Sequence, residues 1–184
     1  PKTISTYSIL FILNNTLTPR QFIGKVHLEG IISDKNELIE ELNDINQNEN
    51  IKGLLIIVNS PGGTFVSSKE ILDKIEKISI RIPTSVYMRE MGTSGAYLAS
   101  LGVNKIFANQ GTITGSIGVI LQTAQLTSLM EKIGITPIVI KSGKLKATPN
   151  PLEKMDEEKK KYLEKIIGQL QNEFIDIVEK KKKF

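Results

Sequence analysis

Apolar and polar positions in the first half of the chain alternate between the spacing of strands and that of helices. Residues 24–32 alternate as in a strand, and residues 53–58 form a continuous apolar run, typical of a strand buried on both faces. Residues 36–46 and 67–78 instead carry apolar side chains at helical spacing. A further short strand is expected at 84–88. Because strand and helix take turns, the pattern predicts an α/β fold with largely parallel strands.

The second half of the chain predicts shorter elements followed by one long helix. Small residues at 93–101 indicate a short buried helix, and helical spacing returns at 126–133. Glycines mark a turn at 111–115. Strands are expected at 105–108, 117–121 and 136–140. Residues 156–181 carry an apolar stripe, which predicts an amphipathic helix with Asp156 as its N-cap.

No repeat or flexible linker interrupts this pattern. We therefore expect one domain at 24–184, preceded by an N-terminal extension at 1–23. The chain starts with Pro1 rather than Met, so we expect a fragment, either processed or cut, from which any N-terminal anchor has been removed. The longest early apolar run, 9–13, is far shorter than the roughly 20 residues that a membrane-spanning helix needs.

Composition and charge remove several classes of function. Hydrophobic residues make up 40% of the chain but aromatic residues only 5%, with no Trp, so the core is expected to be aliphatic. The formal net charge is +4, much of which comes from the lysines at 180–183. That run is either a solvated tail or an element attracted to a membrane surface. Because no basic stripe is interleaved with aromatic residues, nucleic acid is not expected as a partner.

The chain has no cysteine and a single histidine, His27. The lack of cysteine excludes thiolate nucleophiles and thiolate metal sites, and we expect neither a metal nor a cofactor. His27 lies inside a predicted strand beside apolar positions, so we expect a structural role for it. The glycine-rich phosphate-binding motifs of nucleotide-binding proteins are also absent.

Two glycine-containing segments at the ends of predicted strands could carry chemistry. Residues 59–63 (NSPGG) are either a tight turn or a place where bare amide groups approach a ligand. Residues 92–96 (GTSGA) place Ser94 before a short helix, where free N–H groups favour developing negative charge. Ser94 is therefore either a nucleophile or an ordinary N-cap. The nucleophile-elbow pattern GxSxG is matched only in part, since position 96 is Ala.

A serine nucleophile needs a base. The structural role expected of His27 leaves lysine as the alternative, because burial lowers the pKa of a lysine enough for it to accept a proton. Lysines occur downstream in the predicted loop at 141–151, within the segment KSGKLK at 141–146. Pairs of serine and lysine are an established variant of the catalytic triad.

Four stretches together resemble the signal peptide peptidase family of the SppA type, also called protease IV, within the ClpP/crotonase fold. They are NSPGG at 59–63, TSGAYLAS at 93–100, ANQGTITGSIGV at 108–119 and KSGKLK at 141–146. The resemblance covers nearly the whole chain and implies a fold with repeated β-β-α units and a long C-terminal amphipathic helix. It also implies a serine endopeptidase with a Ser-Lys dyad that hydrolyses peptide bonds of signal peptides or membrane-protein remnants.

The resemblance assigns roles residue by residue. Ser94 corresponds to the family nucleophile and Lys146 to the base, while Ser116 orients the base. The amides of Gly63 and Gly95 correspond to the oxyanion hole. An extended peptide substrate is expected to pair with the backbone near Gly62, Ile117 and Gly118.

The resemblance also implies partners and a location. Members of the family form homo-oligomers whose sites are shared between subunits, and an N-terminal anchor holds them to the bacterial cell membrane with the catalytic domain on the extracytoplasmic side. Two other functions remain open for a chain of this fold. One is a non-catalytic peptide-binding scaffold, and the other is a crotonase-type acyl-CoA enzyme.

Overall fold

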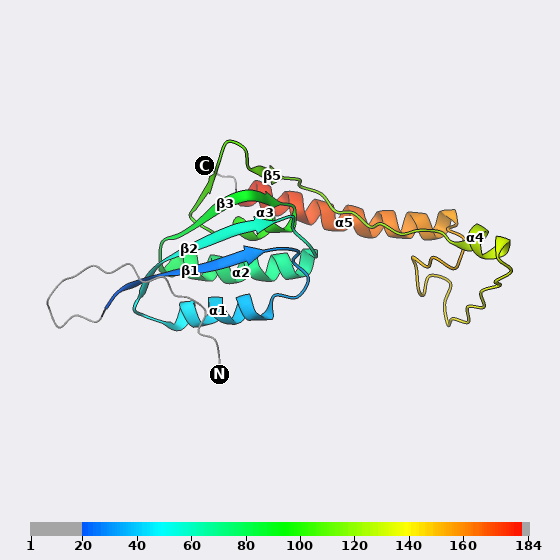
Figure 1. Ribbon diagram of the computed structural model, residues 1–184, viewed down its shortest axis with the longest axis horizontal. Helices are drawn as coiled ribbons and strands as arrows, with labels where there is room; N and C mark the ends of the chain where they lie inside the picture. Colours follow the sequence, from blue (N-terminus) through cyan, green and yellow to red (C-terminus); the bar gives the residue numbers. More distant parts are fainter. Residues whose placement is uncertain (1–19, 182–184) are drawn as a thin grey trace. The chain divides into compact units, whose positions relative to one another are not determined.

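The computed structural model describes residues 20–181, which group into two compact units (Figure 1). Unit 1 comprises residues 20–117 and 177–181, and unit 2 comprises residues 118–176. The apolar run at 9–13 and most of the expected N-terminal extension lie outside the described residues. Within the described residues, none of the helices is both long enough and apolar enough to cross a membrane.

Unit 1 is built on a parallel sheet, so the predicted α/β fold is confirmed. Its strands run in the order β1 (Phe22–Glu29), β2 (Ile51–Ser60), β3 (Thr84–Thr93) and β4 (Lys105–Ala108). A short strand, β5 (Ile113–Gly115), pairs with the end of β3 beyond β4. All of these pairs are parallel. The carboxyl ends of β2 and β3 therefore lie side by side, and each glycine-containing segment spans one of those ends.

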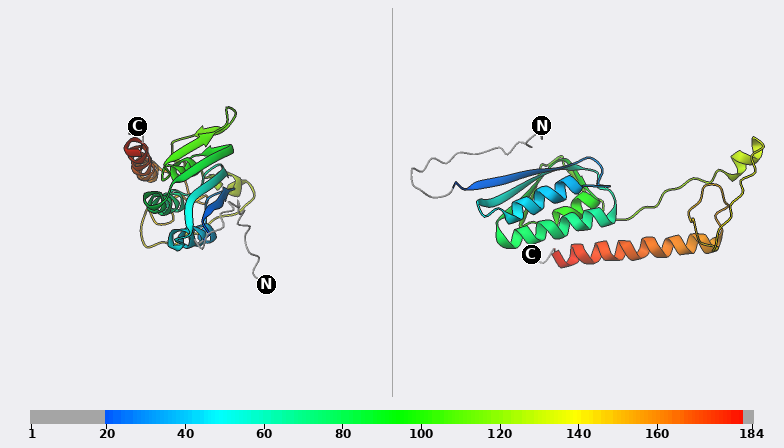
Figure 2. Two further views of the ribbon diagram at one scale, coloured as in Figure 1. Left: turned by 90° about the vertical axis from the view of Figure 1, so that its left-hand side faces the viewer. Right: turned by 90° about the horizontal axis from the view of Figure 1, so that it is seen from below.

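Three helices of unit 1 pack against the sheet through one aliphatic cluster. They are α1 (Asn36–Gln47), α2 (Phe65–Arg81) and α3 (Gly95–Ser100). Figure 2 shows α1 and α2 beside one another along the sheet. The buried cluster consists of Ile, Leu, Val, Met and Ala side chains, which confirms the expected aliphatic core. This packing fixes the turn between β3 and α3, which contains Ser94.

Unit 2 contains α4 (Thr127–Lys132) and most of α5 (Glu157–Lys181). The predicted N-cap of the long helix is confirmed, because the Asp156 carboxylate accepts a hydrogen bond from the Lys159 amide at 2.8 Å. This bond is the main reason that the pKa of Asp156 is lowered. The loop expected at 141–151 has no regular secondary structure.

Three predictions about the segments after 110 are wrong. Residues 117–121 and 136–140 form no strand, although both are apolar. Among the described residues neither segment pairs with another strand, and Ile138 and Ile140 are 85% and 95% exposed. The expected turn at 111–115 instead contains β5, because β3 runs five residues past its predicted end and offers a partner. Strand formation depends on such partners more than on local sequence.

Candidate active site

Ser94 occupies a strained turn between β3 and α3. Its backbone angles are φ 52° and ψ −121°, a region that residues other than glycine rarely adopt. Such a conformation costs about 1–3 kcal/mol and persists only where the surroundings impose it. Here the Ser94 amide donates to the Gly115 carbonyl at 2.8 Å, and the Ser94 carbonyl accepts from the Leu98 amide at 2.9 Å. The hydroxyl makes no capping hydrogen bond, so the interpretation of Ser94 as a side-chain N-cap is wrong.

Gly62 packs directly onto this turn. A Cβ atom at position 62 would lie 2.6 Å from the Gly95 nitrogen and 2.9 Å from Ser94 Cβ, and the φ of Gly62 is +93°. Both facts require glycine there. The buried Ser60 hydroxyl holds Gly62 from behind, since it accepts from the Gly62 amide at 3.1 Å and donates to the Gly30 carbonyl at 2.6 Å. The turn at 59–63 is thus tight, and it also approaches the serine closely.

The neighbouring Gly63 presents its amide on the side away from Ile32. The Gly62 carbonyl accepts from the Ile32 amide at 2.9 Å, and the Thr64 amide donates to the Ile32 carbonyl at 2.7 Å. In this parallel bridge between Ile32 and Gly63, the N–H and C=O groups of Gly63 itself point away from Ile32. A Cβ atom at position 95 would lie 3.1 Å from the Gly63 nitrogen, so the amides of Gly63 and Gly95 are close neighbours.

Neither of these two amides donates a hydrogen bond to any residue in the described range 20–181. Gly63 is exposed, and Gly95 begins α3. Two neighbouring N–H groups without acceptors, close to the backbone of Ser94, are donors of the kind that can bind an oxyanion. The structure therefore brings together Ser94, Gly62, Gly63 and Gly95.

Ser68 on α2 supports this arrangement and was missed by sequence reasoning. Its side chain is fully buried, and its Oγ donates to the Thr64 carbonyl at 2.8 Å. The same Oγ would lie 2.2 Å from a Cβ atom at position 95. A signal was present in the sequence, because Ser68 is a polar residue on the buried stripe that continues with Ile71 and Leu72.

The remaining expected site residues of unit 1 lie just beyond β5. Ser116 follows Gly115, whose carbonyl binds the Ser94 amide, and it adopts a φ of 54°. Ser116 is exposed, as is Ile117, the last residue of this part of unit 1. His27 lies two strands away on β1, where its Nδ1 is 3.4 Å from a carboxylate oxygen of Glu29.

The loop at 141–151 carries two candidate bases in unit 2. The Lys144 ammonium forms an ion pair with Glu158, whose hydrogen bond and charge raise the pKa of Lys144. A lysine held in its charged form cannot accept a proton. The Lys146 side chain is exposed, and its ammonium has no hydrogen bond or ion pair with any residue between 20 and 181. Ser94 belongs to unit 1, whereas Lys146 belongs to unit 2. Gly118 also belongs to unit 2, as its first residue.

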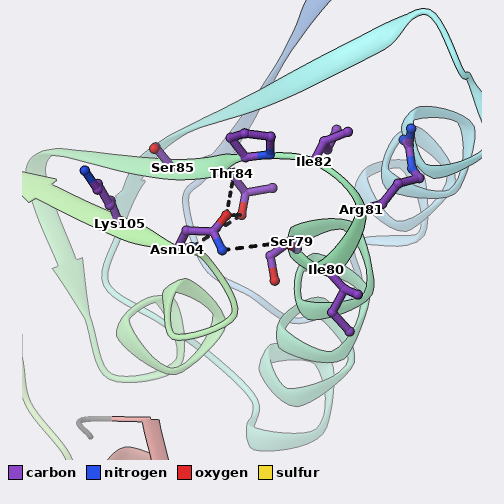
Figure 3. A pocket seen from close by; sticks show the side chains of 9 residues that line it. Ser79, Ile80, Arg81, Ile82, Thr84, Ser85, Asn104 and Lys105 are labelled. Atoms are coloured by element: carbon purple, nitrogen blue, oxygen red, sulfur yellow. Dashed lines mark hydrogen bonds between the residues drawn. The ribbon is translucent and has the colours of Figure 1, made fainter. Parts of the chain in front are cut away.

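Two alternatives to the Ser94 turn lack support among the described residues. No group of three His, Asp or Glu side chains there could hold a metal ion. An open pocket of about 500 Å³ lies at the start of β3, at the opposite end of the strand from Ser94 (Figure 3). At its centre Asn104 Oδ1 accepts from the amide and the hydroxyl of Thr84, so these polar groups are already paired.

Comparisons with known proteins place this chain among peptidases. Residues 76–184 match the model described as peptidase family S49, and residues 24–109 match the model of Clp protease. A protein of Methanocaldococcus jannaschii named as a protease is 36% identical over 77% of this chain and 46% of its own length. A protein of Enterococcus faecium named as signal peptide peptidase SppA is 34% identical over 86% of this chain and 50% of its own length.

The solved structure of a membrane-bound stomatin-specific protease is also similar to this chain. It shares 19% identity with a TM-score of 0.49, over 59% of this chain and 53% of that one. The chain thus spans about half the length of the curated relatives it matches.

Proposed function

Because the chain belongs to peptidase family S49, we propose that it is the catalytic part of a serine endopeptidase with Ser94 as nucleophile and Lys146 as base. One observation carries this proposal. The strained Ser94 turn lies against two adjacent amides, those of Gly63 and Gly95, which have no acceptor among the described residues.

The chemistry follows from this geometry. Neutral Lys146 accepts the hydroxyl proton as Ser94 Oγ attacks the carbonyl carbon of a peptide bond. The Gly63 and Gly95 amides then bind the oxyanion, and losing one such donor typically costs about 10²–10³ in rate. Lys146 passes the proton to the leaving amine, and water hydrolyses the acyl-enzyme. Ser116 orients the amine of the base.

Lys146 is favoured over Lys144 as the base for an electrostatic reason. Glu158 holds Lys144 in its charged form, whereas Lys146 has no acidic partner among the residues described. A lysine base must be desolvated to lose its proton near neutral pH. Lys146 is exposed within unit 2, so it becomes buried only when it is placed against a serine site. In this proposal that site belongs to the assembled homo-oligomer, in which subunits share residues.

The substrate is an extended peptide that pairs with the backbone at Gly62, Ile117 and Gly118. Signal peptides and membrane-protein remnants fit the name of the Enterococcus relative and the lack of charged side chains in these segments. The peptidase domain comprises residues 24–184, and residues 1–23 lead to an anchor in the bacterial cell membrane. The domain then acts on the extracytoplasmic side.

Cleavage of a quenched-fluorescent apolar peptide by the full-length protein tests the proposal. Ser94→Ala is expected to lower kcat by about 10³-fold or more, because no other group can form the acyl-enzyme. Ser85→Ala is the matched control, since Ser85 lies on the same strand at the opposite end. Hydrolysis that survives Ser94→Ala undiminished refutes the proposal. Peptide binding without turnover would instead indicate a scaffold, and binding of coenzyme A without peptide cleavage would indicate an acyl-CoA enzyme.

A further inference from the structure

One carboxylate in unit 2 is held by two lysines. Glu153 accepts from the Lys141 ammonium at 2.8 Å and 2.6 Å through its two oxygens, and from the Lys159 ammonium at 2.7 Å. The side chains of Glu153, Lys141 and Lys159 are only 18%, 21% and 11% exposed. Ion pairs that are this sheltered are screened by salt much less than those at a free surface.

The cluster of Glu153, Lys141 and Lys159 lies at the two ends of the loop that contains Lys146. Lys141 and Glu153 are the two ends of the segment that contains Lys146, which lies in the yellow and orange stretch between α4 and α5 in Figure 1. Their ion pair therefore closes the loop. Lys159 attaches this closure to the first turn of α5, and its ammonium also donates to the Lys154 carbonyl at 3.1 Å.

Further contacts hold the end of the loop near Glu153. The Leu126 amide donates to the Pro151 carbonyl at 2.8 Å, and the Met155 amide donates to the Gln125 side chain at 2.9 Å. The segment between positions 141 and 153 is thus restrained at its two ends, while Lys146 near its centre remains exposed. Because the ends of the loop are restrained, Lys146 has fewer conformations from which to reach the serine, and the entropic cost of reaching the reactive geometry is lower.

A second ion pair on the same loop serves as a comparison. Lys144 and Glu158 also join the loop to α5, but both side chains are more than half exposed. Exposed single pairs contribute little to holding a structure. The hydrogen bonds from Lys141 and then Lys159 lower the pKa of Glu153, so that its carboxylate stays ionised and both lysines stay engaged. Of the two acidic residues, Glu153 is the one placed to hold the loop.

We propose that Glu153 is a positioning residue, which holds the loop closed through Lys141 and Lys159 so that Lys146 is presented to the nucleophile. This inference rests on the proposed role of Lys146 as base. Glu153 itself touches neither the substrate nor the reacting atoms in this account. Its effect therefore belongs to the chemical step rather than to peptide binding.

Glu153→Gln in the full-length protein tests the inference. Glutamine keeps the shape of the side chain but loses the charge, and kcat is expected to fall about 10- to 100-fold with KM within about twofold of the wild-type value. Glu153→Asp should recover part of the loss, since it restores the charge. Glu158→Gln is the matched control and should keep kcat within about twofold. The rates are normalised to the number of sites labelled by a fluorophosphonate, so that a smaller folded fraction does not count as lower kcat.

Lys141→Gln keeps the test valid if Glu153→Gln does not fold, because the Glu153–Lys159 pair then remains. It should lower kcat in the same direction. Wild-type kcat per labelled site in a folded Glu153→Gln or Lys141→Gln variant, together with an inactive Lys146→Ala variant, overturns this inference alone. Full activity of Lys146→Ala would instead overturn the proposed function, and with it this inference.

Discussion

The two segments that carry the proposed dyad are held in place by different forces. Around Ser94 the restraints are neutral: backbone hydrogen bonds, glycines in van der Waals contact, and the buried hydroxyls of Ser60 and Ser68. Around Lys146 the restraints are mainly charges, above all the Glu153 carboxylate between two lysines. The segment around Ser94, whose proposed role needs a fixed backbone geometry, is thus held by close packing. The segment around Lys146, which would supply a mobile proton acceptor, is held by ion pairs.

This difference separates the conditions to which each segment responds. Buried neutral hydrogen bonds do not depend on pH, and salt has little effect on them. Ion pairs require ionised partners, so they are lost when the carboxylate becomes protonated. Mutations near Ser94 should therefore act at every pH, whereas mutations near Lys146 should act only where the carboxylates are charged.

Gly95→Ala should cause the largest loss. The new Cβ atom would lie 2.2 Å from Ser68 Oγ and 3.1 Å from the Gly63 nitrogen, so Ser68 or the backbone at Gly63 must shift and the two amides are disturbed. Losing one oxyanion donor predicts a fall in kcat/KM of about 10²–10³, measured by peptide cleavage with thermal unfolding in parallel. Gly111→Ala is the control, because nothing lies within 4 Å of a Cβ atom there. Equal rates in the two variants would contradict the proposed oxyanion hole.

Ser68→Ala and Ser100→Ala remove matching groups with different expected effects. Both serines are buried on helices and donate to the carbonyl four residues earlier, at 2.8 Å to Thr64 and 2.7 Å to Ala96. Each variant should lose about 1 kcal/mol of unfolding free energy, measured with urea. Of the two serines, only Ser68 lies against Gly95, one of the two proposed oxyanion donors. Only the Ser68 variant should therefore also lower kcat, by about tenfold. If kcat falls equally in both, Ser68 has no special part in the site.

The stability contributed by Glu153 should depend on pH. Its folded pKa lies below the ordinary carboxyl value of 4.5, so the contribution is present above that pH and is lost as the pH falls through the lowered value. The difference in urea unfolding between wild type and Glu153→Gln should therefore be largest near neutral pH and vanish in acid. The difference for Ser68→Ala should stay constant over the same range. A Glu153 effect that persists unchanged in acid would show that charge is not its cause.

Lys144→Gln should have the smallest effect. Its ion pair with Glu158 is exposed, and such pairs are worth little. We expect kcat within about twofold of wild type, measured with the same peptide, while Lys146→Gln is inactive. The opposite result, an active Lys146→Gln and an inactive Lys144→Gln, would move the base to position 144.

The sequence could predict the framework because buried strands and amphipathic helices leave local signals. The apolar run at 53–58 lies within β2, and the stripe after Asp156 forms α5 with the expected cap. The same rule failed at 136–140, where an apolar run has no described partner strand. It also missed β5, whose formation depends on the extended end of β3 rather than on its own residues.

The site shows a similar division. The motifs pointed to Ser94 and to the glycines that lie against it, because glycine is required where backbones approach so closely. Ser68 was missed although it is a polar residue on a buried helical stripe, because its partners follow from packing and not from local sequence. The Lys141–Glu153 pair joins residues twelve positions apart across a loop without periodicity, so no spacing rule could indicate it.

The most direct test of the central claim is the rate and position of fluorophosphonate labelling in the full-length protein. Peptide mapping by mass spectrometry should find the adduct on Ser94, and Lys146→Ala should slow its formation by about 10²-fold or more, because the hydroxyl then has no base. An adduct on another residue, or labelling of Lys146→Ala at the wild-type rate, would contradict the claim that these two residues form the catalytic pair.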